Sequence, residues 1–158
     1  MRLKDEDYMA AAYELAALAL QEQDIPVGAV VVTAEGEIVG RGRNLRRIKH
    51  DPTAHAEIVA LRDAAVKLNT WNLSGCTMFV TLEPCPMCAG ALVQARIARL
   101  VYGCADPKAG ACGTLYNITS DSRLFHRLSV AGGVMEQPCR EILQDFFIKC
   151  RQRKKADR

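Results

Sequence analysis

The chain has no hydrophobic run long enough to cross a membrane as a helix, and its first residues do not lead into the apolar stretch of a secretion signal. It also has no internal repeat, no low-complexity tract and no linker. With 158 residues, 49% of them hydrophobic and 25% charged, its composition is that of an ordinary soluble globular protein. These absences argue against a membrane protein or a repeat protein, and we expect a single domain over residues 1–158 in the cytoplasm.

Histidine is scarce and cysteine is abundant, with three histidines and seven cysteines in the chain. In a secreted protein an odd number of cysteines would suggest disulfides and one spare thiol. Without a secretion signal, the closely spaced pair Cys85 and Cys88 is better explained by metal binding. We expect the other five to be ordinary core or surface thiols: Cys76, Cys104, Cys112, Cys139 and Cys150.

Charge is unevenly distributed, although the net charge is only +3. Residues 41–49 hold five basic side chains and no acidic one, and residues 149–158 hold six basic side chains and one acidic one. Each segment therefore carries +5, which leaves −7 for the rest of the chain. This pattern is typical of a localised phosphate-binding face, although a basic C-terminal segment can also be simply solvated.

The hydrophobic pattern predicts helices that alternate with short buried strands. Helices are expected over residues 5–23, 51–68, 84–96 and 137–153, with Pro84 or Pro86 as the start of the third and with Asp5 and Asp51 as N-caps of the first two. Strands are expected over residues 27–33, 37–43, 77–82, 100–103 and 128–131, and the first two form a hairpin. Residues 44–53 and 104–114 are expected to be loops. The order predicts an α/β fold with helices on both faces of a sheet.

One histidine and two cysteines form the most informative pattern in the chain. His55, Cys85 and Cys88 supply three ligands, the number that a catalytic zinc needs while its fourth position stays open for water. Glu57 follows two residues after the histidine, where it can move protons between that water and a substrate. Histidine-x-glutamate followed by proline-cysteine-x-x-cysteine is the signature of zinc-dependent nucleobase deaminases.

Both halves of this pattern fall at the expected N-termini of helices, where free N–H groups and the helix dipole stabilise thiolates. A closed structural zinc site would need a fourth protein ligand such as Cys76 or Cys112, and neither has a spacing that recommends it. A thioredoxin-like dithiol would leave His55 and Glu57 without a role. We therefore predict a catalytic zinc, one per subunit.

Three segments closely resemble bacterial tRNA-specific adenosine deaminases of the TadA type, in the cytidine and deoxycytidylate deaminase superfamily. They are residues 25–30, with the sequence IPVGAV, residues 51–58, with DPTAHAEI, and residues 80–91, with VTLEPCPMCAGA. The likeness runs from about residue 5 to residue 153. It implies a three-layer cytidine-deaminase-like fold with a five-stranded mixed sheet, a homodimer, and conversion of the wobble adenosine in a tRNA anticodon loop to inosine.

The resemblance also assigns roles to residues. His55, Cys85 and Cys88 match the zinc ligands, and Glu57 matches the proton shuttle. Asn44 matches an asparagine that hydrogen-bonds the flipped-out nucleoside, Val27 resembles a residue of the pocket wall, and Ala56 is placed in the same substrate site. Asn44 would otherwise be explained as a turn residue after a strand, and Val27 as plain core.

Contacts with RNA are assigned more broadly. Residues 106–110 resemble a loop beside the anticodon, where Lys108 would meet phosphate, and Phe146 and Phe147 resemble aromatic residues of a C-terminal helix near the RNA. Adjacent helical residues point about 100° apart, so one can face the core and the other the substrate. Charge alone suggests further phosphate contacts, namely Arg151 together with Arg46, Arg47 and Arg153, and His126-Arg127 resembles a family pair near the substrate loop.

Two other functions remain compatible with the sequence. A deaminase of free guanine, cytosine or a nucleotide would share the zinc motif, and the basic C-terminal helix together with Thr81-Leu82 before Glu83 favours the tRNA enzyme. A zinc-stabilised RNA-binding module would bind tRNA without releasing ammonia, and its Glu57 would be dispensable.

Overall fold

The structure, a computed structural model, describes residues 3–157, so Arg158 of the basic C-terminal segment lies outside the described residues, as do Met1 and Arg2. The elements in chain order are α1 (Asp5–Gln21), β1 (Gly28–Val32), β2 (Ile38–Arg43), α2 (Arg46–Lys49), α3 (Ala56–Leu68), β3 (Thr77–Leu82), α4 (Pro86–Gln94), β4 (Arg99–Cys104), the 3₁₀ turn η1 (Ile118–Ser120), β5 (Ser129–Gly132) and α5 (Glu136–Ala156). Among the described residues, no helix combines the length and the apolar character needed to cross a membrane.

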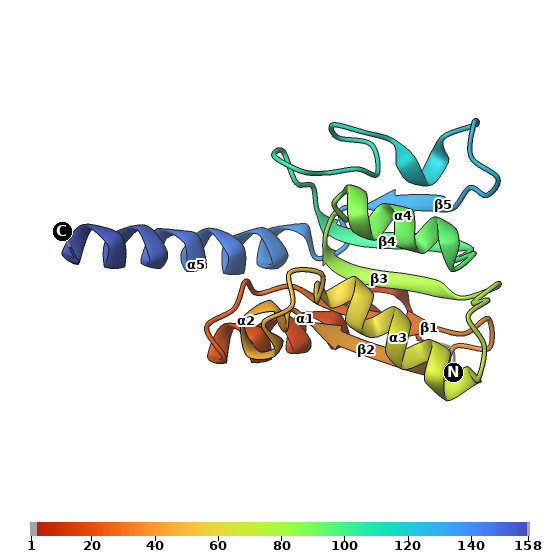
Figure 1. Cartoon of the computed structure of the whole chain (residues 1–158), viewed down its shortest axis with the longest axis horizontal. Coiled ribbons are helices and arrows are strands. Elements are labelled where there is room, and N and C mark those ends of the chain that lie inside the picture. Colours follow the sequence, from red (N-terminus) through yellow and green to blue (C-terminus); the bar gives the residue numbers. More distant parts are fainter. Residues whose placement is uncertain (1–2, 158) are drawn as a thin grey trace.

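The five strands form one mixed sheet in the order β2-β1-β3-β4-β5. β1 is antiparallel to both β2 and β3, whereas β3, β4 and β5 are mutually parallel. β2, β3, β4 and β5 therefore run in one direction, and their carboxyl ends share one edge of the sheet with the amino end of β1. Figure 1 shows the loops after β2 and β4 and the start of α5 at this edge.

Helices cover both faces of the sheet. A side chain at Gly28 would point into the backbone of α1, and one at the opposite-facing Gly42 would point into the backbone of α3. A side chain at Gly103 would meet Cys139 of α5, on the face that α1 also covers. α4 lies beside α3 (Figure 1). The predicted three-layer α/β fold with a five-stranded mixed sheet is confirmed.

The core explains why the central strands are continuous apolar runs. All five residues of β1 are buried, and so are the four central residues of β3, because helices pack on both sides of them. Gly40 and Gly42 of β2 let α3 approach unusually closely, since a Cβ at Gly42 would lie 2.2 Å from the Ala56 carbonyl oxygen. This close packing places the start of α3 directly over the sheet edge.

The start of α1 differs from the prediction. Lys4 rather than Asp5 is the N-cap, and the Lys4 N–H donates to the Asp7 carboxylate at 2.8 Å. Asp5 is instead the first helical residue, and its carboxylate binds the Arg99 guanidinium of β4 through two contacts of 2.9 and 2.7 Å. The local sequence predicted that the Asp5 side chain caps the helix, but in the structure it forms a long-range ion pair with Arg99 instead.

The start of α3 also differs. Asp51 does not cap it, because its carboxylate accepts hydrogen bonds from the Thr53 N–H and hydroxyl and closes a turn. The helix begins at Ala56, with His55 as its N-cap residue. The preceding basic segment, which was expected to be a loop, contains the short helix α2.

Candidate active site

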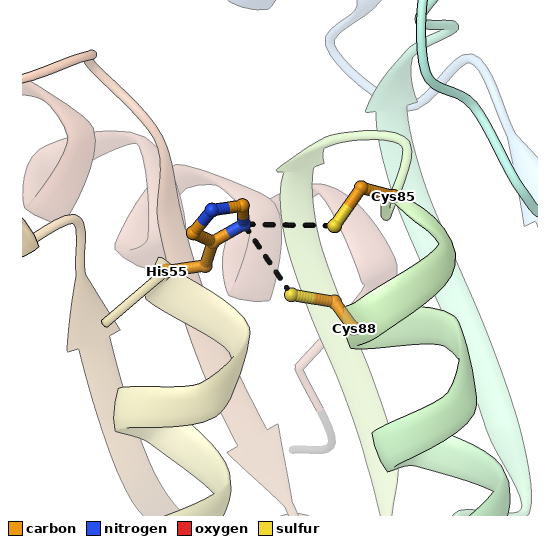
Figure 2. A group of neighbouring side chains, drawn as sticks. All are labelled: His55, Cys85 and Cys88. Atoms are coloured by element: carbon orange, nitrogen blue, oxygen red, sulfur yellow. Dashed lines mark hydrogen bonds between the residues drawn. The ribbon is translucent and has the colours of Figure 1, made fainter. Parts of the chain in front are cut away.

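Three metal-ligand atoms meet between the starts of α3 and α4. His55 is the N-cap residue of α3, Cys85 is the N-cap residue of α4, and Cys88 lies in the first turn of α4, which Pro86 opens. The His55 Nδ1 lies 3.6 Å from the Cys85 Sγ and 3.5 Å from the Cys88 Sγ. Figure 2 shows the three side chains pointing toward one another from the two helices. The sequence pattern thus becomes a spatial cluster because both helices start at the same edge of the sheet.

The cluster fits a metal ion with an open coordination position. Its three ligand atoms lie within 4.8 Å of one another, and within the described residues no fourth histidine, cysteine or carboxylate joins the group. Cys76 and Cys112 are buried outside it, so neither closes the site. Two thiolates and one imidazole match the preference of zinc.

The two thiols of the site shift each other's pKa in opposite directions. A hydrogen bond from Cys88 is the largest factor that lowers the pKa of Cys85 to about 4, and the same hydrogen bond raises the pKa of Cys88. Cys85 is therefore the thiolate of the pair. A metal ion would replace the remaining thiol proton, because metal binding requires both sulfurs to be deprotonated.

Glu57 lies in the first turn of α3, two residues after His55. It is only 3% exposed, and burial raises the pKa of its carboxyl to about 7. Its side chain also interacts with Cys88. A buried carboxyl beside the ligand cluster can exchange protons with a group held there.

Asn44, one of the predicted substrate residues, follows β2 and is 5% exposed. Its Oδ1 accepts a hydrogen bond of 2.8 Å from the Ala56 N–H, the first residue of α3. Its own N–H donates to the Val27 carbonyl at 3.3 Å. The structure thus links three of the predicted substrate residues, Asn44, Ala56 and Val27, to one another beside His55 and Glu57.

Glu83 is a buried carboxylate for which the sequence analysis found no role. It is 1% exposed at the end of β3, and it binds the loop that follows β4. The signal was present in the sequence as an acidic residue at the end of an apolar strand, directly before Pro84-Cys85. Such a residue is buried only where hydrogen-bond donors surround it.

Lys108 is on this loop and is exposed, and its backbone N–H donates to the Asp106 carboxylate at 2.9 Å. Phe146 of α5 is half-buried and lines a hollow of about 360 Å³ with Gln23, Asp24, Ile25, Arg46 and Arg47. Phe147 is 44% exposed and makes an edge-on contact with Phe146, with ring centroids 5.3 Å apart. The two rings therefore differ in burial, as helical geometry requires of neighbours.

The remaining basic candidates lie in different settings. The Arg47 side chain binds the Gln23 side-chain oxygen at 2.9 Å, whereas Arg151 and Arg153 are exposed on the part of α5 that extends away from the sheet in Figure 1. His126 lies 2.7 Å from the Ile97 carbonyl oxygen through its Nε2, which must therefore be the donor. The His126 imidazole therefore forms a hydrogen bond within the protein.

A three-layer fold with an open histidine-cysteine-cysteine cluster and an adjacent buried glutamate defines the class of metal-dependent deaminases with a cytidine-deaminase-like fold. The family model described as MafB19-like deaminase matches residues 3–151, and the chain belongs to this deaminase family.

Known relatives extend the comparison. The chain is 44% identical over 155 residues to a tRNA-specific adenosine deaminase of Bacillus subtilis, covering 98% of this chain and 96% of that protein. A solved structure from a study of A-to-I editing by tRNA:A34 deaminases matches with a TM-score of 0.83 and 40% identity, covering 87% of this chain and 99% of that one. A guanine deaminase of Bacillus subtilis matches with a TM-score of 0.64 and 35% identity, covering 71% of each chain.

Proposed function

We propose that this protein is a tRNA adenosine deaminase, which converts the wobble adenosine of a tRNA anticodon loop to inosine and releases ammonia. The observation that carries the chemistry is the buried Glu57 carboxyl beside the His55, Cys85 and Cys88 cluster. The near full-length similarity to a tRNA-specific adenosine deaminase supports the choice of substrate.

In this proposal His55, Cys85 and Cys88 hold one zinc ion per subunit, which supplies a water molecule with a pKa lowered to near 7. Glu57 would take a proton from this water as the water oxygen bonds to the carbon that bears the amino group, and would pass the proton to the adjacent purine ring nitrogen. It would then move the second proton of that oxygen to the amino group, so that the carbon–nitrogen bond breaks, ammonia leaves and the oxygen remains as the carbonyl of inosine. Burial keeps bulk water away from this carboxyl, so that the protons it carries move between water and substrate.

The residues around the cluster would receive the base. The Asn44 amide nitrogen can donate to the nucleoside, because its oxygen is already held by the Ala56 N–H. Val27 forms the adjacent apolar wall, and Ala56 acts by orienting Asn44. The base must leave its stack to reach this buried position, which a single-stranded anticodon loop permits at low cost.

We assign RNA contacts to side chains around this edge of the sheet and on the part of α5 that extends away from it. Lys108 and Arg151 would bind phosphates, and Phe146 and Phe147 would contact bases of the loop beside the hollow that Arg46 and Arg47 line. Because these contacts include ion pairs with phosphate, the affinity for tRNA should fall as salt rises, whereas turnover of a free base would not depend on such contacts.

We also propose a homodimer in the cytoplasm, where tRNA is found. Two exposed aromatic side chains that both lie against the Arg96 guanidinium support self-association: Trp71, which is 66% exposed, and Phe125, which is 61% exposed. Light scattering of the purified protein would measure the mass directly, and a monomer at micromolar concentration would contradict this part of the proposal.

The test is a deamination assay with the zinc-loaded protein. A tRNA with adenosine at the wobble position is the lead substrate, with free guanine, cytosine and deoxycytidylate in parallel reactions. Inosine at the wobble position alone supports the proposal, whereas product only from guanine would reassign the substrate to the class of the guanine deaminase that shares the fold.

Glu57→Ala separates an enzyme from a zinc-stabilised RNA-binding module. The variant should keep its zinc, because Glu57 is not among the three ligands, and should lose about 10²- to 10⁴-fold in rate. Zinc content is measured by elemental analysis and inosine by nuclease digestion. A variant as active as the wild type would contradict the assigned role of Glu57.

A further inference from the structure

The loop after β4 is built around the carboxylate of Glu83. The Glu83 Oε1 accepts a hydrogen bond of 3.1 Å from the Asp106 N–H, and its Oε2 accepts bonds of 3.0 and 3.2 Å from the N–H groups of Cys112 and Thr114. The Thr114 hydroxyl also donates to Oε1. One side chain thus joins both ends of a segment that we define as the 106–114 loop.

The hydrogen-bond donors around Glu83 require an acceptor side chain at this position. Its three backbone partners are N–H groups, which can only donate, and the Thr114 hydroxyl completes the set. Gly110 lies so close that a Cβ there would be 2.6 Å from the Glu83 carboxylate and 2.6 Å from the Asp106 carbonyl oxygen. The loop is therefore wrapped tightly around Glu83.

A second contact fixes the loop to the metal-bearing segment. The Ala111 N–H donates to the Pro84 carbonyl at 2.9 Å, directly before Cys85. Glu83, Pro84 and Cys85 are consecutive, so the loop and the thiol ligand are held by the same short stretch of chain. Within the loop, the Asp106 carboxylate accepts the Lys108 and Ala109 N–H groups and leaves the Lys108 side chain exposed.

We propose that Glu83 is a positioning residue, whose carboxylate fixes the 106–114 loop beside the cluster of His55, Cys85 and Cys88 as the wall that meets the RNA. This inference rests on the proposed function. Glu83 touches neither the substrate nor the metal. It acts by setting the position of the loop and, with it, the position of Lys108.

Glu83→Gln gives a directional test, because an amide keeps the size of the side chain but provides one oxygen only. The oxygen is best placed toward the Cys112 and Thr114 N–H groups, since both are fixed donors. The amide NH₂ then faces the Asp106 N–H, while the Thr114 hydroxyl can rotate to accept. We therefore expect the Asp106 end of the loop to be released first.

Thr114→Val is a milder variant that keeps the buried carboxylate and removes one donor, and Thr114→Ser is its matched control because it keeps the hydroxyl. All variants are compared as zinc-loaded full-length proteins. Hydrogen exchange of the 106–114 loop, zinc content, and KM and kcat for tRNA are measured for each.

For Glu83→Gln we expect faster exchange in the loop, an unchanged zinc content, and a loss in kcat/KM of about 10- to 100-fold that appears mainly in KM. Thr114→Val should show the same changes to a smaller degree, and Thr114→Ser should match the wild type. Exchange in α1 should stay unchanged, which separates a local release from general destabilisation.

Unchanged exchange in the loop of Glu83→Gln would overturn the inference, and so would a loss of zinc with an unchanged KM. If Glu83→Gln does not fold, the pair of Thr114 variants decides the same question. A wild-type protein that does not deaminate tRNA would refute the proposed function instead, and tRNA binding by the same variants would then show whether the loop wall meets RNA.

Discussion

The hydrogen bond between Asn44 and Ala56 allows the structural role of Asn44 to be separated from its proposed role in substrate binding. Asn44→Ala removes a buried acceptor and leaves the Ala56 N–H without a partner at the start of α3. A lost partner for a buried donor costs about 1–3 kcal/mol, which corresponds to a lowering of the melting temperature by roughly 2–12 °C in a domain of this size. Asn44→Asp keeps an oxygen for the Ala56 N–H, and the helix N-terminus favours the added negative charge.

We therefore expect Asn44→Asp to melt near the wild-type temperature while losing most deaminase activity, because the carboxylate cannot donate to the nucleoside. Asn44→Ala should lose both stability and activity. Thermal unfolding followed by circular dichroism and the tRNA deamination assay provide the two readouts. Full activity in Asn44→Asp would refute the donor role, and an unchanged melting temperature in Asn44→Ala would refute the anchoring role.

Three further perturbations test the fold and the metal site. Gly42→Ala should destabilise the protein by about 1–3 kcal/mol in urea unfolding, because the new Cβ would lie 2.2 Å from the Ala56 carbonyl oxygen. The control Gly90→Ala in α4 should be neutral or stabilising by about 0.5–1 kcal/mol, because a Cβ there meets nothing within 4 Å. A chelator should lower the melting temperature and added zinc should restore it, because a metal held by His55, Cys85 and Cys88 would join α3 to α4. In Cys85→Ser, the change in melting temperature on adding chelator or zinc should be smaller. The hydrogen bond from Arg99 holds the pKa of the Asp5 carboxyl below its ordinary 3.8, so this ion pair contributes stability above about pH 4 that is lost as the pH falls through the lowered pKa. Both ends of that pair are about a third exposed, so the difference between wild type and Asp5→Asn should be at most about 1 kcal/mol at pH 7 and should shrink at pH 3.

The central strands could be predicted because each is a short apolar run, and the long helices because apolar residues recur along one face of each. β3 was predicted with its observed bounds, since Thr77–Leu82 is an apolar run between polar segments. The helix starts were less predictable, because capping depends on competing partners. Asp5 and Asp51 are both residue types that favour the N-cap position, yet the Asp5 carboxylate binds Arg99 and the Asp51 carboxylate accepts a hydrogen bond from Thr53.

The cluster of His55, Cys85 and Cys88 was predictable because its residue types and spacings restrict the chemistry so strongly. The role of Glu83 was not, because all of its hydrogen-bond donors lie more than 20 residues away along the chain. Likewise, only the structure reveals that Asn44 holds the Ala56 N–H, and that Phe146 shares a hollow with Arg46 and Arg47.

The sequence alone determined the composition of the site: an imidazole, two thiols, and a carboxyl placed two residues from the histidine. It also determined the α/β layering, since short apolar runs bounded by turn residues alternate with longer helical segments. The tertiary structure decided where these groups meet. β1 alone runs against its neighbours, so the carboxyl ends of β2, β3 and β4 gather at one edge, where Asn44, the cluster of His55, Cys85 and Cys88, and the 106–114 loop converge. Strand pairing between distant segments sets that convergence, and no local pattern of residues encodes it.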